Sequence, residues 1–73
     1  SRKTTREKLM EFFLDQAKRH GSAEFTIPYD RQALADYLGV ERSAMSAEIG
    51  KLRKDGLIET SGAWFRVAAS DGK

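Results

Sequence analysis

A short glycine-containing break between two amphipathic segments constrains the fold of this chain more than any other feature. Leu34 and Leu38 share one face of the segment before the break. Met45 and Ile49 share one face of the segment after it. Both pairs have the spacing that aligns side chains along one side of an α-helix. Gly39 lies between them and adopts a positive φ at little cost, so we predict two helices that meet at a steep angle.

The residues beside this break fit a close crossing of two helices. Ala35 supplies a small side chain at the crossing, and Val40 is expected to fill the gap between the helices. We predict one helix over Arg31–Leu38, with Asp30 as its N-cap, and a longer helix over 42–55. A second helix that projects outward in this way fits the major groove of B-form DNA, with its first residues nearest the base edges.

Another amphipathic helix is predicted over residues 4–20. Its apolar side chains recur at helical spacing: Leu9, Phe12, Phe13 and Ala17. Thr4 and Glu7 match a capping box, and Gly21 is a suitable residue to end the helix. We interpret His20 as a residue of the last helical turn, where positive charge suits the helix dipole, and not as a catalyst.

Short extended segments complete the chain. Residues 23–27 favour a strand and end at Pro28, which blocks a continuing helix. Residues 57–60 and 63–67 alternate like two strands on either side of a turn at 61–62.

The order of these elements predicts a mainly α fold with a small β-hairpin, an α+β winged helix-turn-helix with a three-helix core and a wing. We expect one domain over residues 1–73, with a core at 4–67 and a frayed polar tail at 68–73. Adjacent residues of a strand face opposite sides, so only one of Trp64 and Phe65 points inward. The predicted core contains Leu9, Phe12, Phe13, Ile27, Leu34, Leu38, Met45, Ile49, Leu52 and Leu57.

Composition argues against several other classes of function. The chain has no cysteine and one histidine, which leaves no thiolate zinc site and no multi-histidine metal site. It has no nucleophile elbow, no glycine-rich phosphate loop and no titratable pair at motif spacing. No apolar run approaches a membrane span of about 20 residues, and no secretory segment is present. We therefore expect a cytoplasmic module that is not an enzyme and needs no cofactor.

Bulk charge does not by itself indicate a nucleic-acid partner. The chain has 13 basic and 11 acidic residues, a net charge of +2. Basic residues instead gather near the N-terminus and in the third predicted helix: Arg2, Lys3, Arg6 and Lys8, then Lys51, Arg53 and Lys54. Taken alone, each cluster fits a solvated helix face better than an anion-binding surface.

Residues 30–59, read as DRQALADYLGVERSAMSAEIGKLRKDGLIE, resemble the C-terminal domain of the Crp/Fnr regulators, the cyclic-AMP receptor and fumarate–nitrate regulator family. The specific parts are L-A-x-x-L-G-V, R-S-A-M-S and K-L-x-x-x-G-L-I-E, and the middle part favours this family among winged helices. A weaker likeness covers 5–67. The resemblance implies a bacterial, homodimeric transcription regulator whose sensory domain, with its effector site, lies outside this chain.

The resemblance also implies how double-stranded DNA is bound. The third helix would lie in the major groove and contact bases through residues at its start: Arg42, Ser43, Ser46 and Ala47. Phosphates would be held by residues of both helices and of the wing: Arg31, Lys51, Lys54 and Ser61.

The chain departs from the family pattern at two base-contact positions. Ser43 and Ala47 stand where family members often carry glutamate and arginine, so the usual half-site is not implied. Glu41 stands where a Ser or Thr cap is common. Its carboxylate suits the helix dipole but repels a nearby phosphate.

A winged helix that binds a protein partner remains the alternative, because a fold does not dictate function. The small net charge and Ala47 favour it, and a broad exposed patch around Trp64 and Tyr37 would favour it further. The helical wheel favours DNA, because small and basic residues lie opposite the core face of the third helix: Ser43, Ala47, Gly50, Lys51 and Lys54.

Overall fold

The computed structural model describes residues 2–68 as three helices and three strands. In chain order they are α1 (Thr5–His20), β1 (Glu24–Thr26), α2 (Arg31–Leu38), α3 (Arg42–Lys54), β2 (Ile58–Ser61) and β3 (Trp64–Val67). This is the predicted α+β winged helix-turn-helix arrangement. Of the tail predicted to fray over 68–73, residues 69–73 lie outside the described part, and the Ala68 amide donates to the Leu57 carbonyl at 3.0 Å.

Helix α1 begins at the predicted capping box. The Glu7 amide donates to the Thr4 hydroxyl at 3.0 Å, and the Thr4 amide donates to the Glu7 carboxylate at 2.8 Å. Two otherwise unpaired amides at the helix start are thereby satisfied. The apolar stripe faces inward as expected, with Leu9, Phe12 and Phe13 buried.

The turn between α2 and α3 has the predicted geometry. The Asp30 carboxylate accepts a hydrogen bond from the Ala33 amide at 2.8 Å and caps α2. Gly39 adopts a left-handed conformation at φ 70°, and the Val40 amide donates to the Ala35 carbonyl at 3.0 Å. Ala35 is completely buried, which agrees with a close crossing of the helices.

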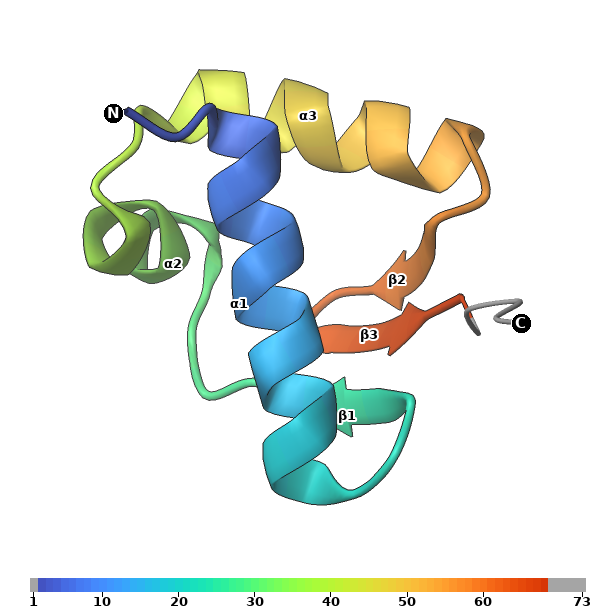
Figure 1. The fold of residues 1–73 in the computed structure, drawn as a ribbon. Coiled ribbons are helices and arrows are strands. Elements are labelled where there is room, and N and C mark those ends of the chain that lie inside the picture. Colours follow the sequence, from blue (N-terminus) through green and yellow to red (C-terminus); the bar gives the residue numbers. More distant parts are fainter. Residues whose placement is uncertain (1, 69–73) are drawn as a thin grey trace.

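The three strands form one antiparallel sheet in the order β1-β3-β2. Sequence patterning predicted the hairpin of β2 and β3, whereas the pairing of β1 with β3 was not predicted. A three-residue strand carries too little pattern to identify its partner, which tertiary packing decides. Figure 1 shows that the sheet lies beside the C-terminal half of α1, whereas α3 crosses the N-terminal half of α1. Both the sheet and α3 contact α1.

All six elements contribute to one hydrophobic core. Phe13 lies at its centre, with its ring centroid 4.6 Å from that of Phe65 on β3 and 6.5 Å from that of Phe25 on β1. Phe65 is buried and its neighbour Trp64 is partly exposed, as the alternation along the strand predicts. The other buried side chains are Leu9, Phe12, Ile27, Leu34, Ala35, Met45, Ile49, Leu52, Ile58 and Val67.

The prediction that Leu57 belongs to the core was wrong. Leu57 is 38% exposed, whereas Ile58 is 2% exposed. Helix α3 ends at Lys54 and the turn at 55–57 delays the strand until Ile58, so the inward face starts one residue later than predicted. In a strand, a shift of one residue moves every side chain to the other face. Leu38, also predicted as core, is partly buried against it.

Candidate nucleic-acid interface

The outward face of α3 carries the four residues predicted to contact bases. All are exposed and lie in the first two turns: Arg42, Ser43, Ser46 and Ala47. Met45, Ile49 and Leu52 are buried against the core. Ser43 and Ala47 lie on the opposite side of the helix, and Arg42 and Ser46 lie on its flank. The core therefore anchors α3 with these four side chains toward solvent.

Positive charge on α3 is left available for an external anion. Lys51 and Lys54, two of the predicted phosphate contacts, are exposed in the second half of the helix, and so is Arg53, which sequence analysis did not assign. Within residues 2–68, the ion pairs involve none of these three side chains and not Arg42.

Nearby acidic groups of α3 and its C-cap are instead paired with α1. The Arg6 guanidinium lies 3.1 Å from the Glu48 carboxylate and 2.9 Å from the Asp55 carboxylate. These pairs join residues 42 and 49 positions apart in the sequence, so spacing alone did not reveal them. Partly exposed ion pairs add little stability, but the single positive charge of Arg6 partly offsets two negative charges beside the basic face.

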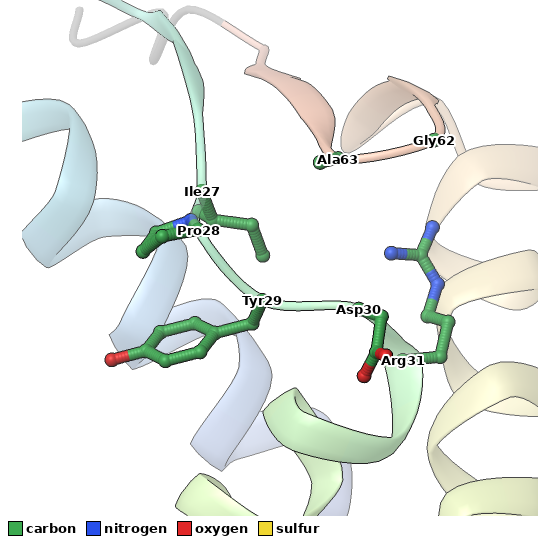
Figure 2. Close-up of a pocket in the computed structure, with 7 residues that line it drawn as sticks. All are labelled: Ile27, Pro28, Tyr29, Asp30, Arg31, Gly62 and Ala63. Atoms are coloured by element: carbon green, nitrogen blue, oxygen red, sulfur yellow. The ribbon is translucent and has the colours of Figure 1, made fainter.

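A second group of predicted contacts lies where α2 begins. Arg31 borders a groove of about 530 Å³, lined by Ile27, Pro28, Tyr29, Asp30, Arg31, Gly62 and Ala63. Figure 2 shows the Arg31 guanidinium directed toward Gly62 in the turn between β2 and β3. Ser61 directly precedes that glycine and is exposed. The fold therefore brings Arg31 and the hairpin turn, far apart in the sequence, to two sides of one groove.

The Arg31 side chain is held over an aromatic ring. Its Cζ atom lies 5.1 Å from the ring centroid of Phe65, a cation–π contact. Because the Phe65 ring is completely buried, it provides a fixed support on β3 for the guanidinium. The sequence does not predict this contact, since it depends on how β3 packs against the start of α2.

A carboxylate closes the N-terminus of α3. Glu41 accepts hydrogen bonds from the Ser43 amide at 3.0 Å and from the Ala44 amide at 2.8 Å. These bonds hold the pKa of the Glu41 carboxyl below its usual value, the Ser43 amide having the largest effect. The group is therefore negatively charged at neutral pH, at the end of α3 that carries the predicted base contacts.

The exposed Tyr37 and the partly exposed Trp64 contact different neighbours. Tyr37 is 63% exposed and stacks on Tyr29, with ring centroids 5.5 Å apart. On the sheet, the Trp64 indole donates to the Glu24 carboxylate at 3.2 Å. Among the described residues, Tyr37 has Phe12 and Tyr29 as its aromatic neighbours, and it forms no aromatic pair with Trp64.

Neither a metal centre nor a membrane segment is found in the described part of the chain. Between residues 2 and 68, no three acidic, histidine or cysteine side chains are grouped to hold a metal ion. The helices of this region are too short or too polar to cross a membrane.

Comparison with known proteins finds a matching domain family and a similar protein. Residues 7–71 match the family of Crp-like helix-turn-helix domains. The chain is also similar to the transcriptional activator protein FnrL of Cereibacter sphaeroides, at 33% identity over 70 residues. This alignment covers 84% of the chain and 28% of the relative, so the chain spans less than a third of that protein's length.

Proposed function

The chain belongs to the Crp-like helix-turn-helix domains of the Crp/Fnr transcription regulators, and from this premise we propose that it binds duplex DNA in a sequence-specific manner. The observation that carries the proposal is the outward face of α3. Four cations without an ion pair among the described residues lie on this helix: Arg42, Lys51, Arg53 and Lys54. A positive helix that projects from a compact core suits the DNA major groove.

In this proposal the first two turns of α3 read the bases. The Arg42 guanidinium has the forked geometry that pairs with guanine O6 and N7. Ser43 and Ser46 offer hydroxyl groups to a base edge or a phosphate. Ala47 leaves room for the helix backbone to approach the floor of the groove.

In this proposal, phosphates on both sides of the DNA major groove hold the domain in one register on the duplex. Lys51 and Lys54 are proposed to contact one stretch of backbone. Arg31 and Ser61 are proposed to grip another, with the hairpin turn as the wing. The support for this second contact is the groove that Arg31 shares with Gly62 and Ala63. Phosphate contacts of this kind fix orientation and supply affinity that depends on salt.

The rest of the regulator is part of the proposal. We infer that the full-length protein is a homodimer that places two such domains on adjacent half-sites, and that an effector binds outside this domain. A single copy should therefore bind weakly, because the second half-site contributes much of the affinity.

Selection from a random pool tests the function. The 73-residue chain is mixed with labelled random duplexes at two salt concentrations, binding is followed by fluorescence anisotropy, and the bound fraction is sequenced. We expect salt-sensitive binding and an enriched motif. Absence of binding at low salt would contradict the proposal and favour a winged helix that binds a protein partner.

A further inference from the structure

Both helices of the helix-turn-helix begin with a carboxylate as the N-cap. Asp30 caps α2 through the Ala33 amide, and Glu41 caps α3 through two amides. The Glu41 cap is the more complete of the two, because each carboxylate oxygen accepts one hydrogen bond. A helix N-terminus without such a cap is well suited to binding a phosphate, since its free amides and its dipole both attract an anion.

The Glu41 carboxylate therefore takes the place that a DNA phosphate would occupy at the N-terminus of α3. The amides that a DNA phosphate would use are already paired, and the carboxylate brings a negative charge to the same place. Arg42 is adjacent, but its side chain forms no ion pair within residues 2–68. Glu48 and Asp55 differ from Glu41, because both are ion-paired with the Arg6 guanidinium.

We propose that Glu41 is a specificity-determining residue, which repels backbone phosphates from the N-terminus of α3 and so weakens binding to random DNA more than binding to the selected sequence. The inference rests on the proposed function, since it concerns the same α3 surface.

Glu41 is expected to affect random and selected DNA differently, because the domain occupies many registers on random DNA and one register on the selected sequence. On random DNA the domain is held by phosphates alone and slides, so phosphates repeatedly approach the end of α3. On the selected sequence, base contacts fix one register in which phosphates are held by cationic side chains. Repulsion from Glu41 therefore acts mainly in the many registers of random binding.

The test compares neutral and charged side chains at this position. Glu41→Gln removes the charge with little change in shape, and Glu41→Asp keeps it. Glu11→Gln is the matched control, because Glu11 is an exposed carboxylate on α1 whose ion pair is with Lys3. The dissociation constant of each variant is measured by anisotropy on a random duplex and on the enriched duplex, over a series of salt concentrations.

We expect Glu41→Gln to tighten binding to random DNA by about 3- to 10-fold, the size of one like-charge contact near water. Binding to the enriched duplex should change much less, so the specificity ratio falls. The salt slope on random DNA should steepen by about 0.9 if one more phosphate is held. Glu41→Asp should keep the wild-type ratio.

An equal change on both duplexes, or a change equal to that of Glu11→Gln, would show that Glu41 is only a helix cap. Thermal melts establish that each variant is folded at the assay temperature. If Glu41→Gln is not folded, Glu41→Ser carries the same expectation, because serine caps a helix without charge. Failure of the unsubstituted chain to bind any duplex would instead overturn the proposed function and this inference with it.

Discussion

Arg42 and Lys54 are exposed on the same helix, yet they are expected to contribute to binding in different ways. Arg42 begins α3, where a helix in the major groove comes closest to the base edges. Lys54 ends the helix, where we propose that its flexible cation meets the DNA backbone but no base. The distinction between reading bases and holding phosphates is therefore testable with single substitutions.

Arg42→Ala should weaken binding to the enriched duplex by about 1–3 kcal/mol and relax the base preference at one position, because the forked contact is lost. The measurement is repeated selection together with anisotropy. Arg19→Ala serves as control, since Arg19 is paired with Asp15 on α1. Unchanged affinity and motif in the Arg42 variant would show that this residue does not face the bases.

Lys54→Ala should weaken binding to all duplexes by similar factors and reduce the salt slope by about 0.9, as expected for the loss of one phosphate contact. Lys18→Ala, an exposed cation in the last turn of α1, is the comparison. A loss confined to the enriched sequence would mean that Lys54 reads bases.

At the scale of the elements, the two glycines of the helix-turn-helix should respond oppositely to alanine. Gly39 has a positive φ and Gly50 lies inside α3, and an added Cβ meets no atom within 4 Å at either site. Gly39→Ala should lower the free energy of unfolding by about 1–2 kcal/mol through backbone strain. Gly50→Ala should raise it by about 1 kcal/mol through helix propensity. Urea denaturation measures both, and destabilisation by Gly50→Ala would contradict this reasoning.

The cap of α3 should make stability depend on pH. The pKa of the Glu41 carboxyl is lowered in the folded state, so its contribution is present above the ordinary glutamate pKa of about 4.3. The contribution is lost as the pH falls through the lower folded-state pKa. Wild type should therefore melt above Glu41→Gln at pH 7, and this difference should shrink at pH 3. A difference independent of pH would exclude the charge as its cause.

The elements were largely predictable because their signals are local. The capping box at Thr4, the turn at Gly39 and the apolar spacing of α3 each lie within a few neighbouring residues. The pairing of β1 and the inward face of β2 were not predictable, because both depend on how the strands pack against the rest of the fold. Leu57 illustrates this limit, since one extra turn residue places it outside the core.

For the whole molecule, the predicted face of α3 agrees with the structure, but the contacts that support it come from elsewhere. Arg6 reaches Glu48 and Asp55 from α1, and Phe65 supports Arg31 from β3. These contacts join residues distant in the sequence, so no spacing rule predicts them. The charge of the candidate interface therefore depends on how the three helices and the sheet pack together.

We propose that α3, the start of α2 and the hairpin turn form one DNA-binding surface. The most direct measurement is titration of the ¹⁵N-labelled chain with the enriched duplex, followed by NMR. We predict that amide shift changes concentrate at residues 42–47, at Arg31 and at 61–63. Changes centred on Tyr37 and α1, with the start of α3 unaffected, would contradict this DNA-binding surface.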